Sequence, residues 1–230
     1  MKSAMLSFLI VLLSVQMLLA ANPPPPPPPA VPALDSYKLV IEWPNTFCLV
    51  EPQPPCQQHP QSFTLHGLWP QAGGRSLVNC PGSPMEDQTL EANKGDLTKF
   101  WPDLRNSDFD KSKSFWRQEW DTHGRCSGKP PADYLTMVFN AVKKYDVQKL
   151  LAKNGILPGD PTGHTAAQFE QAIFKETKLH TEIECRTKDS KEYLFQIYFC
   201  LTPQGQFKNC PIRYRCANQQ IYMPLPPPSP

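Results

Sequence analysis

The eight cysteines constrain the fold of this 230-residue chain more than any other feature. An even number of cysteines behind a secretory signal is typical of a disulfide-linked domain, and we expect four disulfides. Eight cysteines allow about 105 pairings, so their number alone leaves the pairing open. No CxxC pair occurs, which argues against a zinc cluster. The cysteines are Cys48, Cys56, Cys80, Cys126, Cys185, Cys200, Cys210 and Cys216.

The start of the chain predicts secretion. Lys2 precedes an apolar run, Met5–Ala20, that ends in two alanines. This order of a positive residue, an apolar stretch and small residues is that of a signal peptide, which we expect to span residues 1–21. The run is short for a membrane-spanning helix and contains two serines and a glutamine, so a signal anchor is the weaker alternative. We therefore expect a secreted, extracellular protein without a membrane segment, with the vacuole or cell wall as alternative destinations.

Proline-rich segments flank the rest of the chain. Seven consecutive prolines, Pro23–Pro29, follow the signal, and the last residues from Pro224 are again rich in proline. Such runs form extended polyproline II segments with little to pack. We expect tails at 22–35 and 223–230 that act as spacers, with docking as the alternative, around one domain at 36–222.

Three segments of this domain predict strands. Tyr37–Trp43 is apolar and contains β-branched residues. Ser62–Leu65 predicts a short strand that leads into His66. Glu192–Leu201 alternates between two faces, one of which carries Gln196 and Tyr198.

Helices are predicted in the middle of the chain. Ala132–Tyr145 has apolar residues at helical spacing after two prolines. Thr165 and Gln168 form a capping box, which marks the start of a further helix. Strands at both ends with helices between them predict an α+β domain, in which an antiparallel sheet packs against several helices.

Two groups able to transfer protons lie close together in FWRQEWDTHGRC, Phe115–Cys126. Glu119 and His123 are four residues apart, which places both side chains on one face of a helix. Trp116 and Trp120 have the same spacing and predict the face that packs in the core. The glycine after His123 is a natural end for this helix. Glutamate and histidine at this spacing also occur on ordinary solvated helices, so the stretch alone is weak evidence for function.

A second stretch, FTLHGLWP at Phe63–Pro70, adds another histidine. His66 stands between apolar residues, before a glycine and near Trp69, which can stack on a planar group. The alternative for His66 is a hydrogen-bonded core histidine at a strand end. Together the two stretches supply two histidines, a carboxylate and several aromatics, which suffice for acid–base catalysis on a ligand with planar rings. The formal net charge is only +2, so any nucleic acid must bind at a local site.

FTLHGLWP and FWRQEWDTHGRC closely resemble the two active-site segments of the ribonuclease T2 family. YKLVIEWPNTFC resembles the first strand of that family, and GLWPQAGGRSLVNCPGSP and KFWPDLR resemble the region between the two segments in its plant members. The order of the cysteines also matches, over nearly all of Tyr37–Cys216. The resemblance implies an α+β fold and a secreted endoribonuclease that acts on single-stranded RNA as a monomer, without a metal or another cofactor.

The resemblance also implies how the cysteines pair. The bridge to Cys126 would end just after the helix that carries His123, and would help to hold that helix against the rest of the fold. The implied pairs are Cys48–Cys56, Cys80–Cys126, Cys185–Cys216 and Cys200–Cys210.

The family resemblance assigns roles to individual residues. RNA carries its own nucleophile, the 2′-hydroxyl, and cleavage needs a base for that proton and an acid for the departing 5′-oxygen. By motif position, His123 is the expected base, His66 the expected acid, and Glu119 the group that supports the charged transition state. Cleavage would leave a 2′,3′-cyclic phosphate, open to later hydrolysis. Trp69 matches a base-stacking position, and Phe115 a position lining a second base site.

Three residues depart from the family pattern. Gln118 stands where the family usually has histidine, Thr122 where it has lysine, and Glu42 where it often has glutamine; Gln118 and Glu42 are expected substrate-binding positions. Losing the lysine removes a cation from the phosphate site, and one lost electrostatic partner can cost ~100–1000-fold in rate. Arg117 or Arg125 is a candidate substitute. We therefore expect an active enzyme with reduced turnover.

Two biological roles and one non-enzymatic alternative remain open. Gln118 favours an S-RNase of self-incompatibility, which would imply an F-box-type recognition partner. The absence of an Asn-x-Ser/Thr sequon favours an S-like ribonuclease of phosphate recovery, senescence or defence. A catalytically silent binding or storage protein on the same fold is disfavoured, because His66 and His123 are both retained.

Overall fold

The computed structural model describes residues 33–217 and 220–225. The expected signal peptide and most of both proline-rich tails lie outside these residues. The strands are β1 (Ser36–Glu42), β2 (Thr64–Ala72), β3 (Arg75–Ser76), β4 (Glu182–Lys188), β5 (Lys191–Leu201), β6 (Phe207–Lys208), β7 (Arg213–Arg215) and β8 (Ile221–Tyr222). The helices are α1 (Pro44–Val50), α2 (Asp87–Ala92), α3 (Lys94–Phe100), α4 (Phe109–Thr122), the 3-10 helix η1 (Gly124–Ser127), α5 (Pro131–Val142), α6 (Val147–Lys153) and α7 (Ala166–Thr177).

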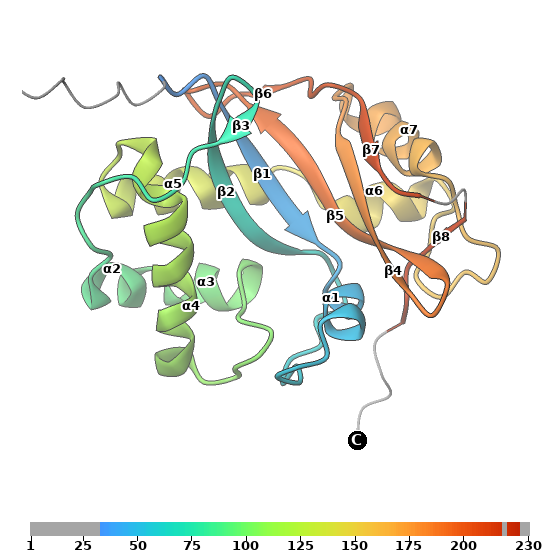
Figure 1. Ribbon diagram of the computed structural model, residues 1–230, viewed down its shortest axis with the longest axis horizontal. Coiled ribbons are helices and arrows are strands. Elements are labelled where there is room, and N and C mark those ends of the chain that lie inside the picture. The colour runs from blue at the N-terminus through green and yellow to red at the C-terminus, as the bar shows by residue number, and fades with distance from the viewer. Residues whose placement is uncertain (1–32, 218–219, 226–230) are drawn as a thin grey trace, which may run out of the picture. The chain divides into compact units, whose positions relative to one another are not determined.

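One sheet organises the domain, with the strands in the order β3-β2-β1-β5-β4-β7 and with β6 and β8 paired to β5. Figure 1 shows α5 and α6 crossing behind this sheet and α2, α3 and α4 grouped beside β2. The predicted α+β class is confirmed. The sheet is not wholly antiparallel, however, because β7 runs parallel to β4 and β8 parallel to β5. These short strands come after the last helix, and the sequence pattern gave no direction for them.

The two faces of the sheet differ in chemistry. Leu39 and Ile41 of β1 and Phe199 of β5 belong to the hydrophobic core, together with buried residues of α5. Each such buried side chain contributes ~1.5–3 kcal/mol. Residues alternate along a strand, so the opposite face receives Glu42 and Gln196, which pair across β1 and β5. Polar groups are therefore gathered on the face turned away from α5.

A β-bulge interrupts the pairing of β1 with β2. Val40 pairs with Gly67, but the next residue, Ile41, pairs with Leu65. His66 is thus an extra residue without a partner in this pairing. A bulge of this kind turns one side chain out of the regular alternation. Strand β2 also continues through His66 to Ala72, beyond the strand predicted at Ser62–Leu65.

The helix that carries Glu119 is fixed at both ends. The Asp108 side chain accepts a hydrogen bond from the backbone N–H of Lys111 (3.0 Å) and caps the start of α4. Trp116 and Trp120 are buried as predicted, and their indole N–H groups donate to backbone carbonyls. The α-helix ends at Thr122, so the predicted base occupies the junction between α4 and η1.

The four disulfides form the predicted pairs, Cys48–Cys56, Cys80–Cys126, Cys185–Cys216 and Cys200–Cys210. The second pair ties η1 to the segment before α2. Next to it, the backbone N–H of Asn79 donates to the carbonyl of Thr122 (2.8 Å). One covalent bond and one hydrogen bond therefore hold the end of the active-site helix.

The packed domain extends slightly beyond the predicted limits of 36–222. At its start, the backbone N–H of Asp35 donates to the carbonyl of Gln71 (2.9 Å). At its end, Met223 is buried and the carbonyl of Pro224 accepts a hydrogen bond from the Trp43 indole (2.9 Å). These residues were expected in the tails, and tertiary contacts recruit them into the domain. Within the described part of the chain, none of the helices has both the length and the hydropathy to span a membrane.

Candidate active site

The bulge in β2, the end of β1 and the end of α4 converge on the polar face of the sheet. His66 lies at the bulge, Glu42 ends β1, and Glu119 and His123 lie at the end of α4. The two sequence stretches that predicted a site are therefore brought together, and Trp69 joins them.

The His66 imidazole lies between two carboxyl groups. Its Nδ1 is 3.7 Å from Oε2 of Glu42, and its Nε2 is 3.8 Å from Oε1 of Glu119. The His66 side chain keeps 27% of its accessible surface, whereas the Glu42 and Glu119 side chains keep 8% and 14%. The imidazole is thus open enough to meet a ligand, and both carboxyl groups lie just beyond direct hydrogen-bond distance of it.

Gln196 of β5 is a site residue that the sequence analysis did not select. Its side-chain amide contacts Nδ1 of His66, and its Oε1 accepts a hydrogen bond from the Tyr198 hydroxyl (2.7 Å). With the amide in this orientation, Nδ1 of a neutral His66 accepts a hydrogen bond and the ring proton resides on Nε2. A glutamine buried in the middle of an apolar strand was the signal that could have indicated it.

A charged network supports Gln196 from behind. The Tyr198 hydroxyl also lies within hydrogen-bond distance of Glu184 of β4, so its single O–H is shared between Gln196 and this carboxylate, which contacts Arg215 (3.0 Å) and Arg186. Glutamine, tyrosine and glutamate therefore form a continuous chain of hydrogen bonds that ends at His66. Such a chain fixes the ring more firmly than a single contact.

Trp69 links the remaining candidates. Its indole stacks on the His123 imidazole with ring centroids 4.9 Å apart, and meets the His66 ring edge-on at 5.1 Å. The indole N–H points to Oε2 of Glu119 at 3.4 Å. One aromatic side chain thus contacts both histidines and the Glu119 carboxyl group. Nδ1 of His123 is buried and lacks a hydrogen-bond partner among the described residues.

Burial shifts the pKa of both histidines and both carboxyl groups of the site. It raises the pKa of Glu119 to about 7, against the effect of the Trp69 hydrogen bond, and the pKa of Glu42 to about 8. Burial lowers the pKa of His66, and the nearby His123 adds to that shift. Burial also lowers the pKa of His123. Near neutral pH Glu42 therefore keeps its proton, Glu119 is divided between its protonated and ionised forms, and the two histidines are neutral.

The other predicted positions surround this group. Phe115 is half-buried and packs edge-on against Trp101, with ring centroids 6.2 Å apart. Gln118 is exposed on α4. The candidate substitutes for a lysine at Thr122 are both engaged, since Arg117 pairs with Asp87 and Arg125 with Asp121 (2.7 Å). Each arginine is therefore already engaged by an aspartate.

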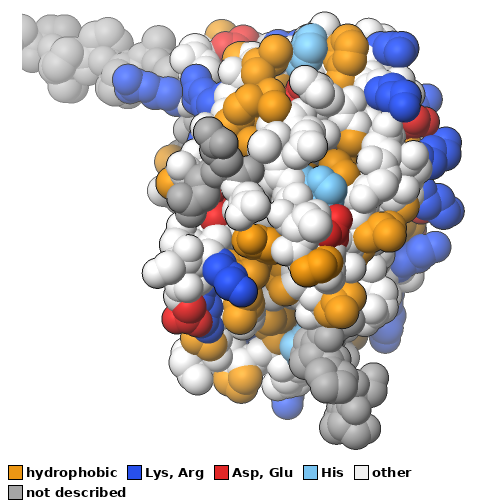
Figure 2. All heavy atoms as spheres, turned by 90° about the vertical axis from the view of Figure 1, so that its right-hand side faces the viewer, with side chains coloured by type: hydrophobic (Ala, Val, Ile, Leu, Met, Phe, Trp, Pro, Cys, Tyr) orange, Lys and Arg blue, Asp and Glu red, His pale blue; other side chains and the backbone are white. Residues whose placement is uncertain are grey.

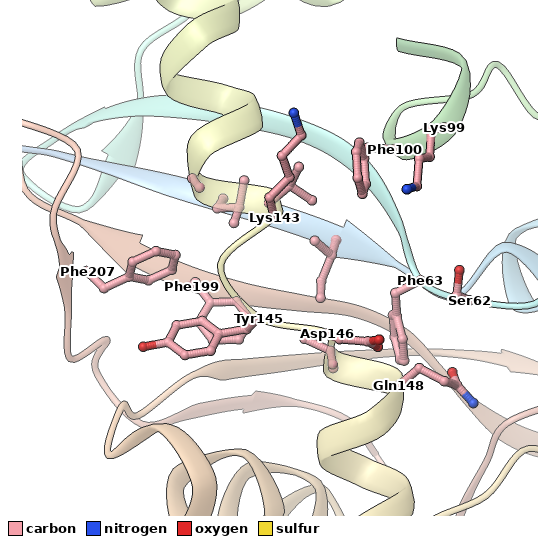
Figure 3. Close-up of a pocket in the computed structure, with 15 residues that line it drawn as sticks. Ser62, Phe63, Lys99, Phe100, Lys143, Tyr145, Asp146, Gln148, Phe199 and Phe207 are labelled. Carbon is pink, nitrogen blue, oxygen red and sulfur yellow. The ribbon is translucent and has the colours of Figure 1, made fainter. Parts of the chain in front are cut away.

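A cavity of about 360 Å³ lies on the other face of the sheet (Figure 3). Figure 3 shows the rings of Phe63, Tyr145, Phe199 and Phe207 around it, with Lys99 and Lys143 above. Among the described residues, its lining includes no histidine. Leu39 and Ile41 line it, and they alternate along β1 with the residues that face His66. This cavity is therefore separated from the candidate site by the sheet itself.

Two groups of side chains in the described part of the chain lie close enough to share a metal ion, Glu182–Cys200–Cys210 and Cys185–Glu192–Cys216. In both groups the sulfurs belong to disulfides, which have no thiolate to offer a metal. The chemistry of the site has to be sought in its histidines and carboxyl groups.

Comparison with known proteins supports this emphasis. The model of the ribonuclease T2 family matches residues 34–210. Ribonuclease S-7 of Nicotiana alata is 31% identical over 80% of this chain and 85% of the relative, and ribonuclease Oy of Magallana gigas is 31% identical over 72% and 85%. Ribonuclease MC1 from bitter gourd seeds superposes with a TM-score of 0.73 at 27% identity, covering 82% of this chain and all of that structure.

Proposed function

This chain belongs to the ribonuclease T2 family and is an endoribonuclease of that type, and we propose that it is secreted and cleaves single-stranded RNA through a 2′,3′-cyclic phosphate. The observation that carries the proposal is the placement of His66 and His123 against the same indole, whose N–H is directed at Glu119. Two imidazoles held apart on a rigid support can act on two different oxygens of one phosphodiester.

In the first step His123 takes the proton of the 2′-hydroxyl, and the 2′-oxygen attacks the phosphorus. His66 donates a proton to the departing 5′-oxygen, so the P–O5′ bond breaks as the P–O2′ bond forms. The orientation of Gln196 supports this role, because it leaves the proton of His66 on Nε2, the nitrogen nearer Glu119. Hydrolysis of the cyclic phosphate reverses the two roles, with water in place of the leaving group.

The environment of His66 bears on how it becomes an acid. Burial holds the pKa of His66 below its ordinary value, and this effect alone would leave the imidazole without the second proton that a general acid needs. The two flanking carboxyl groups have raised pKa values, so near neutral pH Glu42 holds a proton and Glu119 holds one part of the time. The negative charge of a bound phosphate favours the protonated imidazole. We infer that substrate binding moves a proton from this group of carboxyls on to His66.

Glu119 has a second task in this proposal. It is hydrogen-bonded to Trp69 and lies 3.8 Å from Nε2 of His66, so it can orient both. A protonated Glu119 can also donate a hydrogen bond to a phosphate oxygen as negative charge builds there. Trp69 and Phe115 are proposed to bind the two bases that flank the cleaved bond. Nucleotide binding on this fold is supported by a mutant of ribonuclease MC1 solved in complex with 5′-UMP and by ribonuclease NT solved in complex with 5′-AMP.

The four disulfides fit an extracellular protein. We propose that the mature enzyme is a monomer that needs no metal. Its biological role is either S-RNase or S-like ribonuclease, and expression confined to the pistil would select the former. Expression throughout leaf or root tissue would indicate an S-like ribonuclease.

The central experiment is a digest of defined oligonucleotides by the purified, oxidised protein. We expect cleavage of single-stranded RNA in EDTA, a 2′,3′-cyclic product by mass spectrometry, and no cleavage at a 2′-deoxy residue. His66→Asn and His123→Asn should each lower kcat by ~100–10,000-fold. The matched control is His59→Asn, which alters a histidine outside the site and should cleave normally. Cleavage at the 2′-deoxy position, or full activity in either site variant, would contradict the mechanism.

A further inference from the structure

The formal net charge of +2 conceals an uneven distribution of cations. Figure 2 views the molecule from the side of α7 and β7 and shows Lys and Arg side chains gathered along one edge of that face. Other cations lie on the face of the sheet that carries Trp69, outside the group of residues that the mechanism uses. Their positions follow from the pairing of the strands.

Cross-strand partners in a sheet project to the same face. Lys38 of β1 is the partner of Trp69 in β2. On the far side of β5, Glu182 of β4 is the partner of Tyr198 and also of Arg213 in β7. The register therefore places Trp69, Lys38, Tyr198, Glu182 and Arg213 on one face, across five neighbouring strands.

A cavity of about 420 Å³ opens on this face. Its lining includes the side chains of Lys38, Lys208, Arg213 and Gln71. Gln71 follows Trp69 by two residues in β2 and so shares its face, which puts the cavity on the same side of the sheet as the stacking site. The volume is within the ~300–1000 Å³ that is usual for ligand pockets.

The cations of this cavity differ in how they are held. Nζ of Lys38 contacts Glu182 at 2.8 Å and lies 5.5 Å from the centre of the Tyr198 ring, so its position is fixed. Lys208 and Arg213 are exposed at the edge of the cavity. Asp35 also lines it, and its carboxylate accepts from Ser36 and from the backbone N–H of Gly73 (2.6 Å). Three cations thus face two carboxylates, which leaves an excess of positive charge.

We propose that this cavity, hereafter the flanking groove, binds the nucleotides of the RNA strand that continue past the base stacked on Trp69. The inference rests on the proposed ribonuclease function and adds a binding site to it. A single strand is recognised by cations that follow its phosphates, beginning at an aromatic platform. The flanking groove has both, because Lys38 adjoins Trp69 and the exposed Lys208 and Arg213 lie further along.

The test compares a short substrate with a long one. A dinucleotide fills the site at Trp69 and Phe115 and cannot reach the groove, whereas an oligonucleotide extended on either side can. We expect the double variant Lys208→Gln/Arg213→Gln to cleave the dinucleotide like the original protein. In low salt, the KM of this double variant should rise by ~10-fold or more for one of the two oligonucleotides, the one extended on the 5′ side or the one extended on the 3′ side. The slope of log KM against log salt should fall by ~1.4, the value for two lost phosphate contacts to a single strand.

The matched control is Lys149→Gln/Lys153→Gln, which removes two charges from α6 behind the sheet. It should leave both substrates unaffected. The proposal is overturned if the groove variant binds both extended strands normally, if it loses the dinucleotide to the same degree, or if the control variant behaves like it. Binding of a 2′-O-methyl oligonucleotide, which cannot be cleaved, keeps the groove testable even if the original protein cleaves neither substrate. A binding measurement with inorganic phosphate in place of RNA tests whether the groove binds any anion. Binding of an RNA strand should depend on oligonucleotide length, whereas simple anion binding should not.

Discussion

The Trp69 indole lies against the His123 imidazole with their planes inclined by only 28°. The same indole donates its N–H toward Glu119. Trp69 was expected only to stack on a nucleobase of the RNA. It also contacts His123, the proposed general base, and the carboxyl group of Glu119. Changes at Trp69 should consequently affect the chemistry as well as substrate binding.

We first predict that Trp69→Phe raises the pKa of Glu119 above its value of about 7. The hydrogen bond from the indole favours the ionised carboxylate, and phenylalanine keeps a ring over His123 but has no N–H to donate. An NMR titration of the Glu119 carboxyl carbon measures the shift. Trp69→Ala also removes the stacking surface and should raise KM by roughly 5- to 150-fold. An unchanged Glu119 titration in Trp69→Phe would show that the indole hydrogen bond is not formed in solution.

A second prediction concerns Gly67, which follows His66 in the first catalytic stretch and lies close to Glu119 of the second. A Cβ atom at this position would be 2.6 Å from Nε1 of Trp69 and 2.8 Å from Oε2 of Glu119. Gly67→Ala should therefore displace both side chains and lower kcat/KM by ~100-fold, as misplacement by about 1 Å can do. Its control is Gly95→Ala in α3, where the added methyl group meets nothing within 4 Å. Equal activity in the two variants would contradict the close packing described here.

Third, Thr122→Lys should raise kcat with little change in the affinity for RNA. Thr122 directly precedes His123. Arg117 and Arg125 are already paired with aspartates, so the new lysine would not duplicate either of these cations near the phosphate. Charge builds on the phosphate oxygens during attack, which lets a cation stabilise the transition state more than the bound substrate. The gain should be at most ~100–1000-fold. Thr122→Met adds length without charge, and an equal gain in that variant, or a change in KM alone, would refute the electrostatic explanation.

The fourth prediction uses the raised pKa of Glu42. Between pH 4.5 and about 8 this carboxyl is protonated in the folded protein and ionised in the unfolded chain. Unfolding then releases a proton, so stability is lost as the pH rises through this window. Glu42→Gln removes the effect and should stabilise the protein more at pH 8 than at pH 5, by roughly 1–3 kcal/mol. Denaturant unfolding at both pH values measures it, and the exposed Glu51→Gln should show no such difference. A Glu42→Gln gain independent of pH would show that Glu42 is ionised in the folded state.

The sequence predicted much of the fold because its signals were local. The capping box of Thr165 and Gln168 is present as expected, and the alternation in β5 placed Gln196 and Tyr198 on one face. The pairing of the cysteines came from the family resemblance, since the number of cysteines left it open. The lengths of the tails were predicted less well, because Met223 owes its place to burial between distant segments rather than to its neighbours in sequence.

The site was predicted in part. His66, Glu119, His123 and Trp69 were selected from sequence and lie together, although their catalytic roles stay predictions. The hydrogen-bonded chain through Gln196 was missed, because its partners come from strands that are far apart in sequence. The engagement of Arg117 by Asp87 depends on tertiary contacts in the same way.

The bulge at His66 has a consequence for how the protein could change over time. Leu65 and Leu68 are both buried in the core, although an odd number of steps separates them, because the histidine adds one residue between two regular parts of the strand. Loss of that single residue would restore uninterrupted alternation and leave the same leucines inside. His66, the proposed acid, is therefore an extra residue that the fold does not need. A descendant of this protein could lose RNA cleavage by deleting it and still keep the whole fold.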